Sequence, residues 1–170
     1  MRKSIIVITS LLTLVVGLIL HSCSTTPTSG EVVLNVADKS FDLLSKYHFF
    51  EGVLKELKPN AGVLPYDLAS PLFTDYAHKA RFVYVPKGKQ VDYQEEGVLN
   101  LPVGSCYIKN FYYPFDFRDL SKGRRIIETR MLVHRENGWE SLSYIWKDDQ
   151  SDAMLEVAGD IKQVSWIHDD

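Results

Sequence analysis

Cysteine is scarce in this sequence, which has only Cys23 and Cys106 in 170 residues. Two cysteines cannot build a disulfide framework or a cysteine-rich zinc module. Basic residues are not in excess either: 19 lysines and arginines stand against 22 aspartates and glutamates, for a formal net charge of −3. A primary role in binding nucleic acid is therefore not expected.

Motifs of common catalytic sites are also missing. The sequence has no glycine-rich phosphate loop, no nucleophile elbow and no HExxH motif. It does have the composition of a folded domain, with 45% hydrophobic and 24% charged residues, and it is long enough to bury one core. The sequence therefore predicts one folded domain and no recognisable reaction.

Residues 1–22 resemble a lipoprotein signal peptide. Two basic residues precede an apolar run from Ile5 to Leu20, which as a helix would span about 24 Å, less than the roughly 30 Å of a bilayer core. The run ends in Leu20-His21-Ser22-Cys23, which resembles the bacterial lipobox. The resemblance implies that Cys23 is acylated and anchors the chain to the lipid bilayer of the cell envelope. In lipoproteins of Gram-negative bacteria, a serine such as Ser24 favours the outer membrane.

The remainder is expected to form a short tether and one domain. Residues 23–36 are interpreted as the lipidated cysteine and tether, and 37–170 as a single β-rich domain. Apolar spacing predicts helical structure over 38–57, divided at Gly52, and a short helix over 70–78. Strands are expected from about residue 79, at 80–85, 98–103, 106–113, 154–157 and 161–166, in addition to the hairpin described next.

The hairpin prediction rests on Asn137-Gly138, the strongest short turn signal in the chain. With these two residues as the turn, Arg135 pairs with Glu140 and Thr129 with Trp146. The apolar residues of both strands then share one face, on which Val133 pairs with Leu142 and Met131 with Tyr144, while Glu128, Arg130, His134 and Lys147 share the other. The predicted fold class is mainly β, an antiparallel sandwich or an open barrel, with a short helical N-terminal segment, in an α+β arrangement.

Three stretches carry a family resemblance. They are Leu64–Lys79 (LPYDLASPLFTDYAHK), Leu101–Pro114 (LPVGSCYIKNFYYP) and the segment from Arg124 to Ala158, which begins RRIIETRMLVHRENGWE. They resemble a family of secreted or lipid-anchored bacterial proteins often described as diheme c-type cytochromes, over about residues 60–167. In that family a Cys-x-x-Cys-His haem-attachment motif lies downstream of the matching region, and this sequence has none. The resemblance implies that this chain is the non-haem part, that c-type haem is expected only in a downstream region, and that the sequence is cut short at a turn near its end.

Few side chains stand out as chemical candidates. Asp75 and His78 would reach one metal ion from a helical turn, although two ligands are too few for a site. Glu128 and Arg130 could belong to a ligand site or to the solvated side of a sheet. Trp146 could join a sugar-stacking platform or the core; the other candidates for such a platform are Trp139, Tyr107, Phe111, Tyr112 and Tyr113. Cys106, with no histidine nearby in sequence, is expected to be a small buried apolar residue.

Three functions remain open from the sequence. The leading hypothesis is a membrane-anchored envelope module without its own catalytic centre, the non-haem part of a cytochrome-like electron-transfer protein, with a redox protein or a downstream cytochrome domain as partner. The second is an extracytoplasmic ligand- or carbohydrate-binding domain. The third is an envelope enzyme that uses Asp75, His78 or Glu128. The candidate ligand or partner surface is Asp75, His78, Glu128, Arg130 and Trp146.

Overall fold

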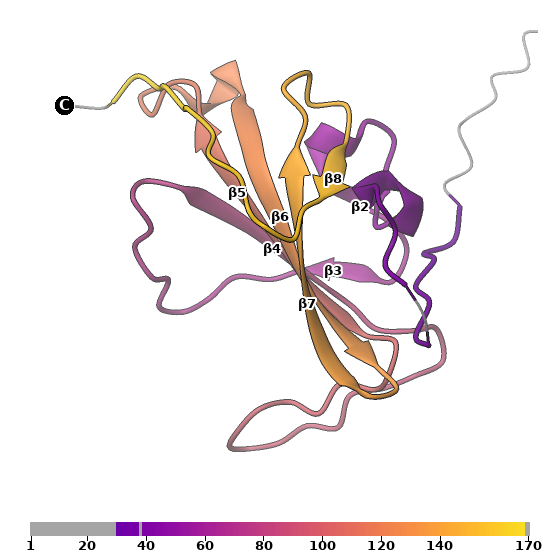
Figure 1. Ribbon diagram of the computed structural model, residues 1–170. Helices are drawn as coiled ribbons and strands as arrows, with labels where there is room; N and C mark the ends of the chain where they lie inside the picture. The colour runs from indigo at the N-terminus through magenta and orange to yellow at the C-terminus, as the bar shows by residue number, and fades with distance from the viewer. Residues whose placement is uncertain (1–29, 38, 169–170) are drawn as a thin grey trace, which may run out of the picture.

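The chain folds around one open, six-stranded antiparallel sheet. The structure, a computed structural model, describes residues 30–37 and 39–168. The strands follow one another across the sheet in the order β3 (Val63–Pro65), β4 (His78–Tyr84), β5 (Cys106–Pro114), β6 (Arg124–Arg135), β7 (Gly138–Trp146) and β8 (Ala153–Leu155) (Figure 1). A second sheet pairs β1 (Phe50–Glu51) with β2 (Lys58–Pro59). The mainly β, antiparallel class is confirmed, and the sheets do not close into a barrel.

The hairpin of β6 and β7 forms with the predicted faces but a different register. The structure pairs Arg135 with Gly138 and Thr129 with Tyr144, a shift of two residues from the prediction. Glu136 and Asn137 form the turn, and Gly138 follows it with φ 121°, a conformation that glycine adopts at little steric expense. A shift of two leaves every side chain on its predicted face. The expected pair survives as a diagonal one, with Arg135 Nε 2.6 Å from Glu140 Oε2.

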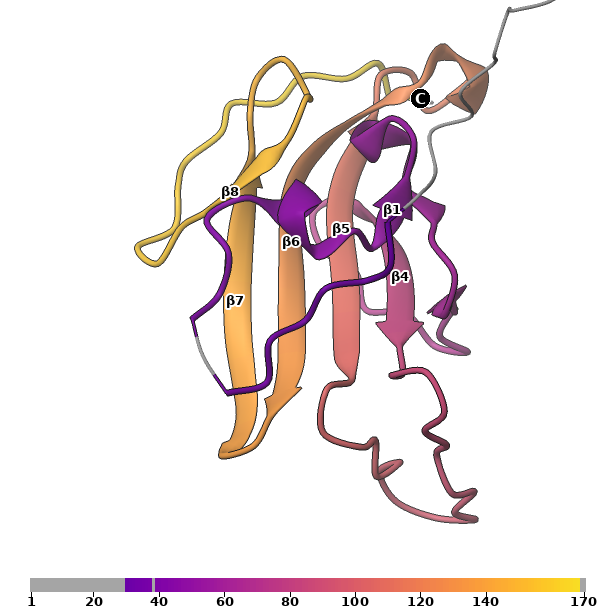
Figure 2. The same ribbon diagram turned by 90° about the vertical axis from the view of Figure 1, so that its right-hand side faces the viewer.

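The predicted helical segment 38–57 forms only two single turns of 3-10 helix, η1 (Leu44–Tyr47) and η2 (Leu54–Glu56). Each turn is ended by a residue with positive φ, His48 at 55° and Leu57 at 53°. Apolar side chains of the segment pack onto one face of the sheet, which we call the inner face; the buried ones are Leu44, Tyr47, Phe49, Phe50 and Leu57. In Figure 2 this N-terminal segment passes in front of β5, β6 and β7.

Hydrogen bonds fix the N-terminal segment to the inner face. The Tyr144 hydroxyl donates to the Phe41 carbonyl at 2.7 Å and lies 2.9 Å from the Tyr47 hydroxyl. Burial and the contact with Tyr47 raise the pKa of the Tyr144 hydroxyl, so it stays a donor at neutral pH. On the loop before β8, the carboxylate of Asp152 accepts from the Ser45 hydroxyl at 2.6 Å. The cover is therefore held by polar as well as apolar contacts.

Other expected elements are irregular. Residues 66–77, 98–103 and 161–166 contain neither helix nor strand, against the predictions of a helix over 70–78 and strands over 98–103 and 161–166. Within the expected tether, Val32 and Leu34 already pack against the core. The predicted signal peptide and Cys23 lie outside the described residues. No helix within 30–37 and 39–168 has the length and apolar character needed to span a membrane.

A buried chain of side-chain hydrogen bonds joins three strands of the sheet. Thr129 on β6 donates to Asn110 Oδ1 on β5 at 2.6 Å and accepts from Trp146 Nε1 on β7 at 2.8 Å. Asn110 and Thr129 are fully buried, and Trp146 is only 2% exposed. Water cannot replace a hydrogen bond lost at this buried position, so removing one of these bonds should lower the stability of the fold.

We expect Thr129→Val to lower the free energy of unfolding by about 1–3 kcal/mol, because it leaves the indole N–H of Trp146 and the amide of Asn110 without their buried partner. Urea denaturation followed by tryptophan fluorescence measures the change. Thr74→Val is the matched control, because Thr74 lies in a loop, is partly exposed and loses only one hydrogen bond, which its hydroxyl donates to the Ala77 carbonyl at 3.2 Å, so it should lower stability less than Thr129→Val does. Equal effects of the two variants would contradict the role of Thr129.

Candidate functional site

Asp75 and His78 are not placed as a metal pair. Asp75 lies in a turn with φ 41°, and His78 is the first residue of β4. The helical turn that was to bring them together does not form. His78 instead contacts Phe117 and Tyr112 by its ring. Among the described residues, no three or more His, Cys, Asp or Glu side chains are grouped so that they could hold a metal ion.

The expectation that Trp146 belongs to a partner surface is wrong. Its ring is buried on the inner face, where Thr129 accepts its N–H. Trp139 is 43% exposed, and its ring stacks on those of His134, at 4.4 Å, and Tyr107, at 5.9 Å between centroids. The sugar-stacking hypothesis can therefore use Trp139 but not Trp146.

Cys106 is a core residue, as expected. Its side chain is fully buried on β5. Burial raises the pKa of the Cys106 thiol far above its ordinary value, so the group is a thiol and not a nucleophilic thiolate at neutral pH. This position gives no support to cysteine-based catalysis.

Glu128 and Arg130 lie side by side on the opposite, outer face of the sheet. Two nitrogens of Arg130 donate to the two carboxylate oxygens of Glu128 at 2.8 and 2.9 Å, and Ser143 donates to Glu128 at 2.9 Å. The hydrogen bond to Glu128 raises the pKa of Arg130. The predicted register also places Lys147 directly across from Glu128, and this is wrong, because the structure pairs Glu128 with Ile145. The polar face itself forms as predicted.

The structure adds three cations to this face that sequence reasoning missed. The register places Arg81 on β4 opposite Lys109 on β5, and Lys109 opposite Arg130 on β6. Lys79 lies two residues before Arg81, and Phe111 two after Lys109. We call the set of Lys79, Arg81, Lys109, Phe111, Glu128 and Arg130 the basic face. The patterns Lys-x-Arg, Lys-x-Phe and Glu-x-Arg of these strands were visible, but the register that aligns them was not.

The electrostatics of the basic face are unfavourable without a partner. Like charges directly opposite each other on a sheet are destabilising. The pKa of Lys109 is lowered by desolvation and then by the charges of Arg130, Arg81 and Lys79, while Glu128 opposes the shift. The ring of Phe111 lies under two of the cations, 5.1 Å from Lys109 Nζ and 4.9 Å from Arg130 Cζ, which relieves part of the repulsion.

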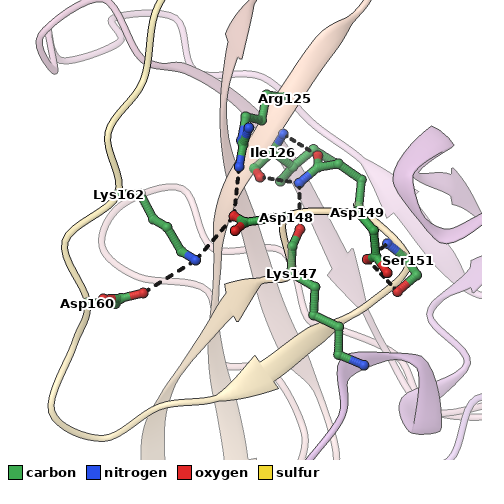
Figure 3. A network of polar contacts seen from close by, with 9 residues as sticks. Arg125, Ile126, Lys147, Asp148, Asp149, Ser151, Asp160 and Lys162 are labelled. Atoms are coloured by element: carbon green, nitrogen blue, oxygen red, sulfur yellow. Dashed lines mark hydrogen bonds and ion pairs between the residues drawn. The ribbon is translucent and has the colours of Figure 1, made fainter.

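The C-terminal segment 156–168 returns along the sheet beyond the basic face. Near β7 its path is fixed by Asp148, which pairs with Arg125 at 2.7 Å and with Lys162 at 3.4 Å (Figure 3). Farther along, Trp166 stacks on Tyr113 at 4.9 Å between centroids. The segment thus meets β5 at Tyr113, four residues past Lys109, and leaves the side chain of Arg130 53% exposed.

The end of this segment is held beside a buried carboxylate. Asp116 is 1% exposed and accepts from Arg118 Nε at 2.9 Å and from Lys122 Nζ at 2.6 Å. The backbone of Asp116 also forms a parallel β-bridge with that of Ile167. The hydrogen bonds from Arg118 and then Lys122 hold the pKa of the Asp116 carboxyl well below its usual range. These contacts close an aromatic cluster around Phe117.

Comparison with protein-family models, with curated proteins and with solved structures finds no match for this chain.

We expect Asp116→Asn to reduce stability at pH 7 and to flatten the acid limb of the stability profile. A carboxyl whose pKa is depressed by folding contributes stability that is fully present above the unfolded pKa, about 3.9 for Asp, and is lost as the pH falls below it. Urea denaturation at pH 7, 5 and 3 measures this for the wild type, the variant and a control, Asp92→Asn, in an exposed loop. If Asp116→Asn follows the wild-type profile, the carboxylate does not fix this region.

Proposed function

We propose that this chain is a lipid-anchored envelope protein whose β domain is a binding module without its own catalytic centre, and that it forms the non-haem part of a cytochrome-like electron-transfer protein. The observation that carries the binding role is the basic face, where ordered cations stand on adjacent strands and remain partly open to solvent. Such an arrangement on a rigid sheet is typical of a recognition surface.

The family resemblance supports the electron-transfer context. Its three stretches contribute to every strand of the six-stranded sheet: Leu64–Lys79 enters β3 and β4, Leu101–Pro114 contains β5, and the stretch from Arg124 contains β6, β7 and β8. The resembling residues are thus those that build one structural unit. Haem attachment through Cys-x-x-Cys-His cannot use this chain, whose two cysteines are far apart in sequence.

The lipobox-like sequence supports the anchor. Acylation at Cys23 would place the lipid a few residues before Gly30, where the described chain begins. From there the chain runs along the inner face (Figure 2). The basic face lies on the other side of the sheet from this segment. The proposed location is the outer membrane, on the pattern of Ser24.

Cys23→Ala should abolish lipidation and release the protein from the membrane fraction, because no other residue carries the lipobox pattern. Metabolic labelling with radioactive palmitate and fractionation of the envelope measure both effects. Cys106→Ala, which changes the other cysteine, should keep the label. Palmitate retained on Cys23→Ala would contradict the anchor.

The electron-transfer role predicts a haem protein associated with this chain. The affinity-tagged full chain is purified in detergent from the envelope of the bacterium that encodes it, and haem is detected by its peroxidase activity after electrophoresis. We expect a haem-stained protein in the eluate and no haem on a band of this chain's own mass. Residues 1–29 fused to an unrelated protein control for membrane proximity and should retain no haem.

Two results would contradict this proposal. Absence of any haem protein from the wild-type eluate would remove the electron-transfer context. Haem attached to the chain itself would show that this is not the non-haem part.

A further inference from the structure

The centre of the basic face is an arginine that is nearly buried but has no acidic partner. Arg81 is only 8% exposed. Within 30–37 and 39–168 no carboxylate forms an ion pair with Arg81 or with Lys109. Buried charges in proteins are normally paired or bound to a ligand. Arg81 is therefore a largely covered cation that has no carboxylate beside it among the described residues.

The residues around Arg81 add further positive charge, which favours the binding of an anion. Lys109 stands directly opposite it on β5, at a separation of about 4.5–5.5 Å between Cβ atoms. Lys79, on the same face of β4, donates to the Leu72 carbonyl at 2.8 Å, and its pKa is lowered first by desolvation and then by the charge of Arg81. Glu128 is occupied by Arg130 and Ser143. Within the described part of the chain, Arg81 and Lys109 thus form no ion pair, although the formal charge of the protein is −3.

We propose that Arg81 and Lys109 form a binding site for a dianionic phosphoryl group, with Lys79 and Arg130 at its edges. A planar guanidinium and an ammonium on adjacent strands can both donate to the oxygens of one tetrahedral phosphate. A dianion neutralises both unpaired charges at once, whereas a single carboxylate leaves one of them unpaired. The ligand class is a phosphate monoester or inorganic phosphate. The site rests on the geometry of the sheet and does not depend on the proposed electron-transfer role.

The basic face is open to solvent at Arg130, whose side chain is 53% exposed, whereas Arg81 is only 8% exposed. The N-terminal segment covers the inner face (Figure 2), and the C-terminal segment meets β5 at Tyr113. Tyr66 stands beside the site: its backbone N–H donates to the Arg81 carbonyl at 3.0 Å, and its ring contacts that of Tyr107 at 6.2 Å between centroids. The Tyr66 ring, from the β3 side of β4, therefore meets the Tyr107 ring on β5, and the two rings limit how far a ligand can spread.

The test titrates inorganic phosphate, glycerol 3-phosphate and acetate into the full lipidated chain in a neutral detergent, by calorimetry. We expect saturable binding of both phosphates and none of acetate. Lys109→Gln and Arg81→Gln should each weaken binding by about 10- to 100-fold, the loss of one charge-assisted contact. Lys87→Gln is the matched control, because the Lys87 side chain is 96% exposed, and it should bind as the wild type does.

A second readout follows Lys109 directly. A bound anion favours the charged form of a lysine, so the pKa of Lys109, measured by NMR, should rise when phosphate is added, and the pKa of Lys87 should not. Lys109→Gln keeps the test decisive if Arg81→Gln fails to fold. Lack of saturable phosphate binding by the wild type would overturn the proposal, as would equal affinities of Lys109→Gln and Lys87→Gln. Binding to phosphatidylglycerol vesicles without binding of either soluble phosphate would also overturn it, since that lipid carries a diester monoanion.

Discussion

The structure depends on how apolar side chains cover one face of a single sheet, because the described part of the chain covers the inner face fully and the outer face only in part. The aromatic and aliphatic side chains of residues 41–57 supply the cover of the inner face. They are held by the hydroxyls of Tyr47 and Tyr144 and by Asp152. Burial of apolar area on this side is the main source of stability. The other side is then free to carry charges that a core could not accommodate.

This division explains why the polar groups of the two faces behave differently. On the inner face, Asn110, Thr129 and Trp146 satisfy one another and need no outside partner. On the outer face, Glu128 pairs with Arg130, whereas Arg81 and Lys109 form no ion pair with any residue that the structure describes. A buried network that is complete serves the fold. A cationic cluster without carboxylate partners among residues 30–37 and 39–168 is the basis of the proposed anion site.

Alternation along the strands was enough to predict the faces of β6 and β7, because a side chain changes face at every residue whatever its partner strand. It was not enough to predict the register, because shifts of two residues leave the faces unchanged. The same pattern had already put Trp146 on the apolar face beside Leu142 and Tyr144, which argues against a surface role for it. The mainly β class followed from these strands.

The basic face could not be predicted in this way. Its members come from three strands, and their proximity depends on the registers of β4 with β5 and of β5 with β6. The second of these contains a bulge between Phe111 and Tyr112, which no sequence signal marked. The helices expected over 38–57 failed for a local reason, since left-handed residues at His48 and Leu57 end each turn after a few residues.

The two outermost strands limit how this protein can assemble. β3 and β8 have three residues each, and β3 ends in Pro65, which has no N–H to offer. Beside β8, the Leu155 N–H donates to the Asp42 carbonyl at 2.9 Å, and Leu43 bridges Met154. Neither of these two strands offers a long row of unpaired backbone groups to a foreign strand. β8 pairs with only Tyr144–Trp146 of β7, so strand addition at this side of the sheet would have to use the part of β7 that β8 leaves uncovered.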